Sequence, residues 1–516
     1  MSLSLISYLL DLTWEINWWT VVWWGGMLVA LFHIPSVLLR RETRPMAALA
    51  WVLCLIALPV LGVILWWMIG RTRLERRKRR WARSKKVVTD SLADVRQAIE
   101  LPDDSAHTRI NDGGSHFASD DALYLRQEEG VFPPTEGNRV EIFSSGQDAF
   151  NAFERAIREA TDHVHFQFYI WQRDDMGRRF RDLLTEKAKE GVEVRVLYDA
   201  VGGAPVKRGF MDPLIEAGAK VESFLPVVLF ERQLRVNFRN HRKIIVVDGK
   251  TGFTGGVNIG DEYCDWLDLA FRLDGPVVLQ LQEVFAEDWY FATGEDLAST
   301  RYFVGTEAVQ KALEETSERE DDADDIEQGR VAESVTARII ASGPDNPESA
   351  IQNVFFMAIT GASRRIYITT PYFVPDQAML MAIKTAAMRG VDVRLLTPGT
   401  SDIPIAQAAG RSYYAELLAA GVRIYEYHEE RVLHAKSVVV DDVWSIIGSA
   451  NMDIRSFLLN FEANAVLRDR ELNSTLAELF ETHLERSTEM RLQDFEKRPL
   501  KHRLVESTAR LFSPLL

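Results

Sequence analysis

The stretch Asn240-His241-Arg242-Lys243-Ile244-Ile245-Val246-Val247-Asp248 contains the spacing His-x-Lys-x-x-x-x-Asp. The same spacing returns in the second half of the chain, within Leu433 to Asp441. Ten positions after the Asp of each copy stands an asparagine, Asn258 or Asn451. One such match is a weak motif, but two copies with the same downstream residue rarely coincide by chance. The repeat therefore predicts two related halves that carry equivalent residues.

Both copies continue into β-branched runs, Ile244 to Val247 and Val438 to Val440, which predict buried strands. Residues two apart on a strand share a face, so the His and the Lys of each copy point the same way. The Asp lies seven residues after the His and has the opposite parity. We therefore expect Asp248 and Asp441 to support the motif from a turn.

The residue types suit chemistry on a phosphodiester. Histidine serves as nucleophile or as general acid and base near neutral pH, lysine supplies positive charge, and asparagine supplies amide donors. Together such groups stabilise charge, attack phosphorus and protonate a leaving group. The predicted catalytic residues are His241, Lys243, Asp248, His434, Lys436 and Asp441, and the predicted phosphate-binding residues are Asn258, Asn451 and Ser449.

A carboxylate follows each histidine at a similar distance along the chain. Asp268 lies 27 residues after His241, and Glu462 lies 28 residues after His434. A carboxylate on the far ring nitrogen fixes the tautomer of an imidazole and stabilises its protonated form. We expect Asp268 and Glu462 to orient the histidines, each within its own half.

The composition limits the classes of function. The chain has 516 residues, a formal net charge of −15 and two cysteines, Cys54 and Cys264. Two distant cysteines predict neither a disulfide framework nor a thiolate metal site. The ten histidines show no His-Glu-x-x-His spacing, and the sequence has no Gly-x-x-x-x-Gly-Lys-[Ser/Thr] loop. We therefore expect no metal, no nucleotide and no other cofactor.

Two uncharged apolar runs occupy the first 70 residues, Ile16 to Leu39 and Pro45 to Gly70. With 24 and 26 residues, each is long enough to cross about 30 Å of hydrocarbon, and tryptophans cluster in both. A cleaved signal peptide does not fit, because the basic n-region is missing and the apolar run is too long. Residues 1–70 therefore predict a membrane hairpin. Pro35 and Pro59 leave open whether it spans fully or re-enters.

A basic segment follows directly, from Arg71 to Lys86. It holds ten Lys or Arg against one Glu, or +9, which leaves −24 on the rest of the chain. Basic clusters beside a membrane segment mark the cytoplasmic side and attract anionic lipid headgroups. A nucleic-acid patch fits poorly with so acidic a remainder. The stretch between the two apolar runs carries three basic residues, Arg40, Arg41 and Arg44, which favour the opposite orientation. They are outnumbered by the ten basic residues of the segment from Arg71 to Lys86.

The remainder divides into a linker and two similar α/β blocks. Residues 71–137 form the basic segment and a polar linker, residues 138–330 the first block with an acidic linker, and residues 331–516 the second block. Each block alternates strand and helix patterns, and Gly191-Val-Glu-Val-Arg-Val closely matches Gly390-Val-Asp-Val-Arg-Leu. Such alternation predicts parallel sheets flanked by helices.

Three apolar stretches lie outside this pattern. Leu225 to Phe230 precedes the first motif, and Phe457 to Leu459 follows the second. Core packing is the simplest interpretation of both, although the first also suits an acyl-chain entrance. The C-terminal stretch from Leu500 to Leu516 carries basic residues and suits an interfacial helix.

These motifs, in this order, resemble the phospholipase D superfamily and, within it, the bacterial cardiolipin synthases. The resemblance runs nearly end to end and includes the apolar hairpin, Asn240 to Lys243, Thr370 to Pro375, Leu433 to Ser437, Asn460 to Glu462 and Phe512 to Leu516. It implies two phospholipase D-like α/β repeats with mixed or parallel sheets, one active site at their interface, a phosphohistidine intermediate and no required metal. One residue departs from the pattern, because Gly256 stands where the superfamily often has the serine found at Ser449.

The resemblance implies phosphatidyl transfer between two phosphatidylglycerol molecules, which gives cardiolipin and glycerol. His241 would attack the first lipid, while His434 would protonate the departing glycerol and then activate the second lipid. The near symmetry of the repeats leaves the identity of the nucleophile open. The expected partners are phosphatidylglycerol and anionic membrane lipid but no nucleic acid, and a homo-oligomer stays open. The expected location is the bacterial cytoplasmic (inner) membrane, with the catalytic repeats on the cytoplasmic side.

The alternatives use the same residues. A membrane-anchored phospholipase D would take water as the acceptor, and a related transferase would take phosphatidylethanolamine or another alcohol. A nuclease is disfavoured by the hairpin and by the acidic catalytic portion. A catalytically dead interaction protein is disfavoured because both motifs are complete.

Overall fold

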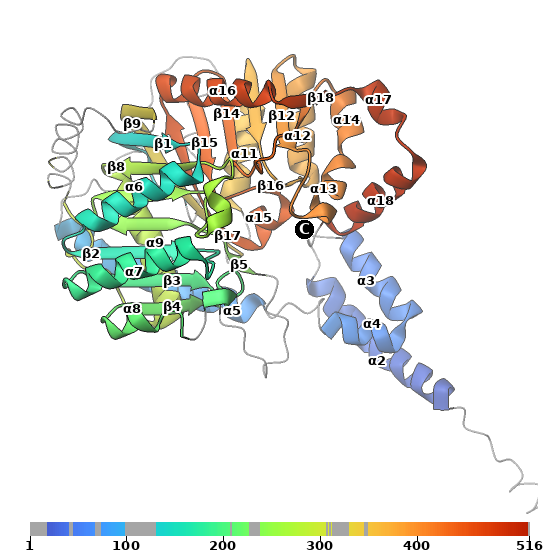
Figure 1. The fold of residues 1–516 in the computed structure, drawn as a ribbon. Coiled ribbons are helices and arrows are strands. Elements are labelled where there is room, and N and C mark those ends of the chain that lie inside the picture. The colour runs from blue at the N-terminus through green and yellow to red at the C-terminus, as the bar shows by residue number, and fades with distance from the viewer. Residues whose placement is uncertain are drawn as a thin grey trace, which may run out of the picture. The chain divides into compact units, whose positions relative to one another are not determined.

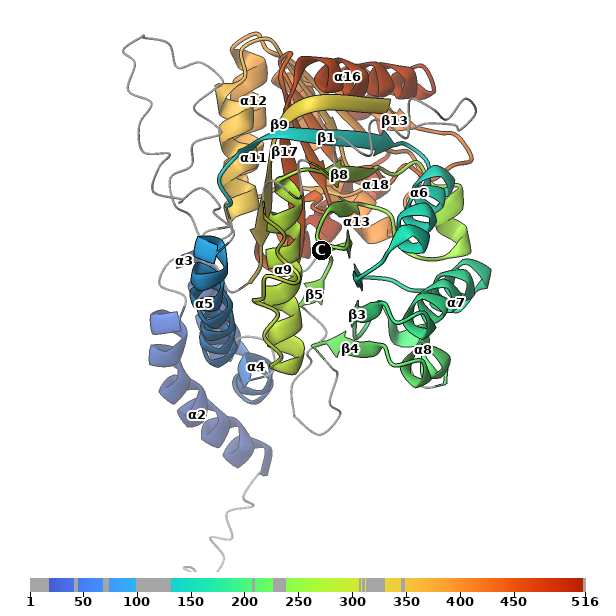
Figure 2. The same cartoon turned by 90° about the vertical axis from the view of Figure 1, so that its left-hand side faces the viewer.

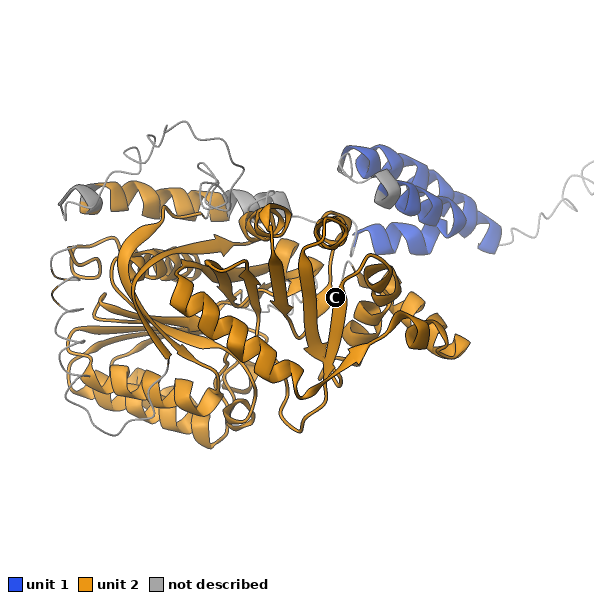
Figure 3. Cartoon of the chain, turned by 90° about the horizontal axis from the view of Figure 1, so that it is seen from above, with its two compact units in different colours: residues 1–79, 229–234 blue, residues 80–228, 235–516 orange. Residues whose placement is uncertain are grey.

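A computed structural model describes residues 18–40, 45–67, 74–98, 131–206, 209–225, 238–305, 308, 311, 330–344 and 349–513. The chain forms two compact units, a small N-terminal unit that ends at Arg79 and a large unit that begins at Arg80 (Figure 3). Three segments that the sequence singles out lie wholly or mostly outside the described residues, namely Leu225 to Phe230, the polar linker before residue 131 and the acidic run Glu314 to Glu327.

The described part of the N-terminal unit before residue 68 contains three apolar helices, α2 (Trp18–Arg40), α3 (Pro45–Ala57) and α4 (Pro59–Leu65). Within the described residues, α2 is the one helix long and apolar enough to cross a membrane, judged by length and composition over Trp19–Leu39. The second apolar run is divided at Leu58, because Pro59 cannot donate a backbone hydrogen bond and starts a new helix. It therefore forms two short helices in place of one continuous span.

Close contacts hold these three helices together. α2 packs against both α3 and α4. Gly26 permits the approach of α4, because a Cβ atom there would lie 2.6 Å from Cγ2 of Val60. The indole N–H of Trp67 donates to Nε2 of His33 over 2.8 Å, and Nδ1 of His33 donates to the carbonyl of Val29 over 2.7 Å. Large apolar side chains cover the outside of the unit, which suits a lipid environment.

A long helix, α5 (Leu74–Ala98), carries the end of the basic segment into the large unit. Its buried face contains Trp81, Val88, Leu92 and Val95. The Trp81 ring stacks on Phe291 and on Phe461, with centroid distances of 4.0 and 3.7 Å. Arg83 and Lys86 lie on the exposed face. The helix is thus amphipathic, with its basic residues toward solvent.

The large unit contains two repeats with the same basic order of strands and helices, which differ in several short elements. The first begins with β1 (Thr135–Phe143), α6 (Gly146–Glu159), β2 (His163–Phe168), α7 (Asp175–Lys189), β3 (Glu193–Asp199), α8 (Asp212–Glu216) and β4 (Lys220–Phe224). It continues with β5 (Arg239–Asn240), β6 (Ile244–Val247), β7 (Thr251–Gly255), β8 (Ala270–Asp274) and α9 (Val277–Thr293).

The second repeat follows the same course. It begins with β9 (Arg330–Ser342), α11 (Ala350–Gly361), β10 (Arg365–Thr369), β11 (Phe373–Val374), α12 (Gln377–Met388), β12 (Asp392–Pro398), α13 (Pro404–Arg411), α14 (Tyr414–Ala419) and β13 (Arg423–Tyr427). It continues with β14 (Ser437–Val440), β15 (Trp444–Gly448), β16 (Met452–Asp453), α15 (Ile454–Leu458), β17 (Asn460–Arg468) and α16 (Arg470–Leu484). The chain then adds β18 (Ser487–Met490), α17 (Leu492–Glu496) and α18 (Leu500–Leu511).

Strands of both repeats join one mixed sheet (Figure 1). Its order is β18-β13-β12-β10-β14-β15-β17-β9-β1-β8-β7-β6-β2-β3-β4, which places equivalent strands symmetrically about the antiparallel pair β1 and β9. β2, β3 and β4 are parallel, as are β10, β12 and β13. The other neighbours along this path are antiparallel, and short hairpins connect β6 to β7 and β14 to β15. The predicted parallel arrangement therefore holds only for the strand–helix–strand part of each repeat.

Alternate residues of the motif strands enter different cores. Ile245 of β6 clusters with α6 and α7, whereas Ile244 clusters with α9. In the same way, Val438 of β14 clusters with α11 and α12, whereas Val439 joins the α9 core together with α16. Both strands are therefore buried on both faces, as their β-branched runs predict.

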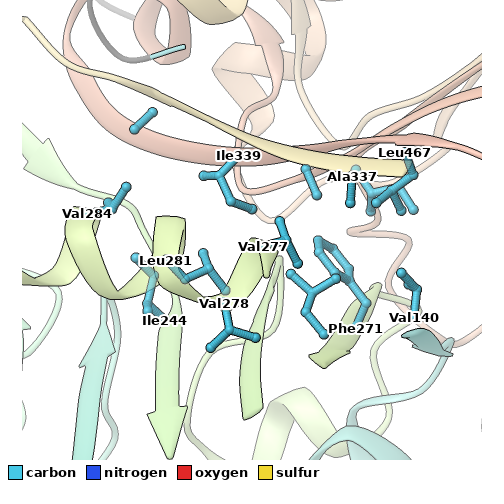
Figure 4. Packing of buried hydrophobic residues seen from close by; sticks show 14 of the residues in the cluster. Val140, Ile244, Phe271, Val277, Val278, Leu281, Val284, Ala337, Ile339 and Leu467 are labelled. Atoms are coloured by element: carbon cyan, nitrogen blue, oxygen red, sulfur yellow. The ribbon is translucent and has the colours of Figure 1, made fainter. Parts of the chain in front are cut away.

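One central core joins the two repeats. Figure 4 shows side chains of α9 packed with residues of both repeats, including Ile244, Phe271, Ala337, Ile339 and Leu467. α5 extends this core along α9 (Figure 2). Each fully buried Val, Leu, Ile or Phe contributes roughly 1.5–3 kcal/mol. Loss of this core would outweigh the net stability of a typical domain, about 5–15 kcal/mol, so the repeats form one folded body.

Replacing Trp81 by Ala should destabilise the large unit, because it removes a buried ring stacked on two phenylalanines. We expect the free energy of unfolding to fall by about 3–5 kcal/mol, measured by chemical denaturation in detergent. Arg83→Ala, on the exposed face of the same helix, is the matched control and should change it by less than about 0.5 kcal/mol. Equal effects of the two substitutions would contradict the anchoring role of Trp81.

Candidate active site

The backbone of each repeat holds the histidine of the other. The N–H of His241 donates to the carbonyl of Phe461 over 2.9 Å, where β5 runs parallel to the start of β17. The N–H of His434 donates to the carbonyl of Leu267 over 2.8 Å, beside the parallel bridge between Leu267 and Leu433. Both histidines are buried. Two motifs 193 positions apart in the sequence are thereby brought to one place.

The carboxylates also cross between the repeats. Nδ1 of His241 lies 2.9 Å from Oε2 of Glu462, and Nδ1 of His434 lies 2.5 Å from Oδ2 of Asp268. The expectation that each histidine is oriented within its own half is therefore wrong. The physical reason is that the residue before each carboxylate bonds to the backbone of the opposite motif. The carboxylate that follows is then next to the imidazole of the other repeat.

The hydrogen-bond partners of His241 decide its tautomer. Nδ1 faces two acceptors, the carboxylate of Glu462 at 2.9 Å and the backbone carbonyl of Ser449 at 3.1 Å. Nδ1 therefore carries the proton, and Nε2 keeps the lone pair that a nucleophile needs. The imidazole meets Tyr169 edge to face, with ring centroids 4.8 Å apart.

The partners of His434 leave its tautomer unfixed. Nδ1 lies 2.5 Å from Asp268, which accepts a proton, and 2.7 Å from Nζ of Lys436, which donates one. Nδ1 cannot donate to the first and accept from the second at the same time. Nζ of Lys436 also lies 3.2 Å from Nε2 of His434. This surrounding suits a group that gains and loses a proton during turnover.

The two lysines have different contacts. Nζ of Lys243 donates to the carbonyl of His241 over 2.7 Å and lies 5.5 Å from the ring centroid of Tyr169. Lys436 forms an ion pair with Asp268 at 3.6 Å in addition to its contacts with His434. Each lysine donates to the backbone carbonyl of the histidine in its own motif, and Lys436 belongs in addition to a His–Asp–Lys cluster.

A cavity of about 340 Å³ contains both histidines. Its lining includes Asn258 and Asn451, the two amides expected to bind phosphate. Ligand pockets measure roughly 300–1,000 Å³, so this cavity has room for a phosphorylated headgroup and not for long acyl chains. Oδ1 of Asn258 accepts from the backbone N–H of Ile170 over 3.2 Å, which leaves its amide N–H groups as the remaining donors.

Ser449, which we expected to bind phosphate, does not line this cavity. Its Oγ donates to Oε2 of Glu462 over 2.5 Å and accepts from the N–H of Ala463 over 3.0 Å. The side chain is fully buried. The hydroxyl proton of Ser449 is therefore engaged with the carboxylate that orients His241.

A steric constraint explains why the first motif has Gly256 at the position that corresponds to Ser449. A Cβ atom at this position would lie 2.0 Å from Oδ1 of Asp268. Asp268 is short and must come close to His434, whereas the longer Glu462 leaves room for a hydroxyl at Ser449. The departure from the repeat thus follows from the difference between Asp and Glu.

Asp248 and Asp441 occupy turns, in agreement with their parity. Their φ angles are 53° and 49°, in the left-handed region that few side chains adopt. The carboxylate of Asp248 accepts from three consecutive backbone N–H groups that lead into β2, and that of Asp441 does the same before β10. Both fix the start of the strand next to the motif strand.

Several cavity residues carry no signal in the sequence, because they follow no repeated spacing. These are Tyr169, Trp266, Arg239 and Arg455, whereas Tyr372, which also lines the cavity, lies within the stretch Thr370 to Pro375 of the family resemblance. The ring of Trp266 lies 5.0 Å from that of His434, edge to face, which gives each histidine an aromatic neighbour. Asn460, which lines the cavity, donates from its amide to Oε1 of Glu462 over 3.0 Å.

Burial controls the charges in the first motif. Desolvation lowers the pKa of His241 to about 4, although Glu462 acts to raise it. Desolvation likewise lowers the pKa of Lys243 to about 7. Burial acts to raise the pKa of Glu462, but the neighbouring His241 and Lys243 outweigh it and hold that pKa below its usual value. At neutral pH the site therefore contains a neutral His241 and an ionised Glu462.

The second motif follows the same logic. Burial, and then the charge of Lys436, lower the pKa of His434. Burial also lowers the pKa of Lys436. Burial acts to raise the pKa of Asp268, but Lys436 and His434 outweigh it and hold the pKa below its usual value.

Within the described ranges, no three His, Cys, Asp or Glu side chains are grouped as metal ligands.

Family models match both repeats and the apolar hairpin. The model described as cardiolipin synthase, PLD-like domain, matches residues 153–289 and 355–484. The model described as phospholipase D-nuclease N-terminal matches residues 27–71. The first match covers one segment in each repeat and includes both histidine motifs.

Curated relatives match nearly the whole chain. Cardiolipin synthase 1 of Bacillus cereus is 36% identical over 95% of this chain and 92% of its own. The cardiolipin synthase of Geobacillus thermodenitrificans is 36% identical over 96% and 95%. The crystal structure of phosphatidylserine synthase from Haemophilus influenzae aligns with a TM-score of 0.55 at 16% identity, over 73% of this chain and 95% of that one. This last likeness shows a common fold.

The pH dependence of kcat/KM should show these shifted pKa values. Since the pKa of His241 is about 4, this imidazole stays neutral until the pH falls to about 4, and activity that needs its neutral form should be lost only there. Since the pKa of Lys243 is about 7, its charge is lost as the pH rises through about 7, and activity should fall there. Lys243→Arg should move this alkaline limb to higher pH. An acid limb at about 6.5, the value of an ordinary histidine, would contradict the assignment.

Gly256→Ser should lower activity by pushing Asp268 away from His434. The added Cβ would clash with the Asp268 carboxylate at 2.0 Å, and loss of an orienting carboxylate typically costs about 10- to 100-fold. Ser449→Gly is the matched control, because it removes a hydroxyl from the equivalent position without crowding Glu462. We expect it to have the smaller effect on initial rates. Full activity of Gly256→Ser would show that the Asp268–His434 contact is dispensable.

Proposed function

We propose that the two histidines of this chain, which belongs to the cardiolipin synthase family of the phospholipase D superfamily, have different catalytic roles. The chain is a phosphatidyltransferase that makes cardiolipin. His241 is the nucleophile and His434 is the general acid and base. The observation that supports this assignment is the contrast between their partners, since Nδ1 of His241 meets only acceptors and Nδ1 of His434 meets both an acceptor and a donor.

The first step forms the covalent intermediate. Nε2 of His241 attacks the phosphorus of phosphatidylglycerol, and the bond from phosphorus to the glycerol oxygen breaks. His434 gives its proton to that oxygen, so glycerol leaves neutral. An anionic phosphate in the cavity favours the protonated form of His434, which Asp268 also stabilises. The motif lysines and the cavity amides stabilise the added charge on phosphorus.

The second step transfers the phosphatidyl group to the acceptor. A hydroxyl of a second phosphatidylglycerol gives its proton to His434, and its oxygen displaces Nε2 of His241 from phosphorus. One phosphodiester bond replaces another, so the reaction needs no nucleotide. The size of the cavity, about 340 Å³, supports entry of headgroups while the acyl chains stay outside.

The protein is membrane-associated, in keeping with its family and its apolar helix Trp19–Leu39. Location of the catalytic repeats on the cytoplasmic side of a bacterial membrane is part of our proposal. Its support is the basic segment that follows the hairpin, which retains Arg83 and Lys86 on the exposed face of α5. A cysteine introduced at Gly113 tests the orientation, because an impermeant thiol reagent should not label it in intact cells. Labelling there would reverse the topology.

The C-terminal helix α18 supports contact of the large unit with a lipid surface. Leu500, Leu504 and Leu511 form one stripe that is 68%, 59% and 79% exposed, while Glu506 and Ala509 lie on the buried face. The exposed Lys501 and Arg503 flank this stripe, one on each side. Burial of each leucine would contribute roughly 1.5–3 kcal/mol, against about 1 kcal/mol for each basic residue near anionic lipid.

Leu500→Ser combined with Leu504→Ser and Leu511→Ser should therefore weaken the activity on lipid vesicles without unfolding the protein. We expect vesicle activity to fall severalfold, while activity on short-chain phosphatidylglycerol in detergent stays unchanged. Lys501→Ser with Arg503→Ser should have the smaller effect, and only on anionic vesicles. An equal loss in both assays would mean that the stripe serves folding.

Products from phosphatidylglycerol as sole lipid test the proposed reaction. Cardiolipin and free glycerol should appear in about equal amounts with little phosphatidic acid, because the acceptor hydroxyl is concentrated at the membrane. Chelation should leave the rate unchanged. His241→Ala and His434→Ala should each abolish turnover, and Lys243→Ala or Lys436→Ala should cost at least about 10²-fold. Predominant phosphatidic acid would make water the acceptor, and a need for added phosphatidylethanolamine would change the acceptor lipid.

A further inference from the structure

The catalytic groups obey the internal repeat, but two charged cavity residues do not. Arg239 stands two positions before His241, where the second motif has Val432. Arg455 stands four positions after Asn451, where the first motif has Glu262. Both arginines line the cavity. A symmetric pair of motifs thus carries an asymmetric pair of guanidinium groups.

These two arginines line the same cavity, near enough for the charge of one to act on the other. Arg239, on β5, is buried, and Arg455, on α15, is half-buried. Burial and then the charge of Arg239 lower the pKa of Arg455, and both charges act on Tyr169. Like charges held near each other disfavour the empty cavity and favour one that contains an anion.

The nearby carboxylates offset this charge only in part. Glu462 is engaged with His241, Ser449 and Asn460. Asp402, another cavity residue, accepts a hydrogen bond from the hydroxyl of Tyr372. Burial raises the pKa of Asp453 to about 7, so this carboxyl is partly protonated at neutral pH.

Transfer from one lipid to another requires such a second anion site. The repeated His, Lys and Asn groups serve the phosphorus that is attacked. The acceptor phosphatidylglycerol carries a phosphodiester of its own, which does not react but must enter the same cavity region. Two phosphates repel each other unless further cations separate them, and guanidinium groups bind phosphate oxygens in a bidentate way.

We propose that Arg239 and Arg455 bind the unreactive phosphodiester of the acceptor lipid and thereby select a phosphate-bearing alcohol over water. This inference rests on the proposed transferase function. The acceptor hydroxyl oxygen bonds to the phosphorus on Nε2 of His241, the P–N bond breaks, and the hydroxyl proton passes to His434. The arginines take no part in this proton transfer, and they hold the acceptor so that its hydroxyl faces the intermediate.

The test compares acceptors that do and do not carry phosphate. Labelled phosphatidylglycerol in mixed micelles yields cardiolipin with a second lipid as acceptor. The same donor yields phosphatidic acid with water, and exchange of labelled glycerol into phosphatidylglycerol requires only the donor site. Added glycerol 3-phosphate is a fourth acceptor, which separates a free phosphate from a lipid headgroup.

Arg455→Gln and Arg239→Gln should each lower cardiolipin formation by at least about tenfold, the effect of losing one charged hydrogen bond to phosphate. Glycerol exchange should change less than about threefold, so the ratio of phosphatidic acid to cardiolipin should rise. Arg455→Lys should retain part of the cardiolipin activity. Glu262→Gln, at the repeat-related position, is the matched control and should leave the ratio unchanged.

Equal losses of glycerol exchange and cardiolipin synthesis would overturn the inference, because the arginines would then serve the donor or the fold. An unchanged product ratio in both Gln variants would overturn it as well. If Arg455→Gln does not fold, Arg239→Gln and Arg455→Lys give the same ratio test. Wild-type enzyme that makes phosphatidic acid and no cardiolipin would instead refute the proposed function itself.

Discussion

The structure depends on an exchange of contacts between the two repeats. The backbone beside each histidine bonds to the other repeat, and the carboxylate that orients each histidine comes from the other repeat. Neither repeat can complete a catalytic pair alone. The central core around α9 and the antiparallel pair β1 and β9 keep the two halves in register for this exchange. A single sheet and a single site are therefore two aspects of one arrangement.

Burial then gives equivalent residues different properties. Both imidazoles are desolvated, which favours their neutral forms. Ser449 adds a hydroxyl proton to Glu462, whereas Gly256 leaves Asp268 open to Lys436. The tautomer of His241 is fixed because its Nδ1 meets only acceptors, whereas that of His434 is not, because Lys436 also contacts its Nδ1. In the proposed mechanism, a duplicated motif thus acquires a nucleophilic half and a proton-transferring half through differences outside the motif itself.

Much of this could be predicted from the sequence, because it depends on local patterns. The β-branched runs predict strands buried on both faces, and the parity of Asp248 and Asp441 predicts their place in turns. The crossed carboxylates could not be predicted, because sequence distance favours the nearer histidine and only strand pairing brings the distant one close. The second apolar run is divided at Pro59. The sequence shows that this proline disturbs a helix, but it does not show whether the helix bends or ends there. Arg239 and Arg455 follow no repeat and become neighbours only in the folded cavity.

The division of roles between the histidines is tested most directly by trapping the intermediate. A phosphatidyl donor with a p-nitrophenol leaving group needs no acid to depart. With His434→Ala, the account predicts a burst of one nitrophenol per enzyme and a stable phosphatidyl label on His241, located by mass spectrometry after quenching. His241→Ala should give neither burst nor label. A label on His434, or turnover without any covalent intermediate, would contradict the account.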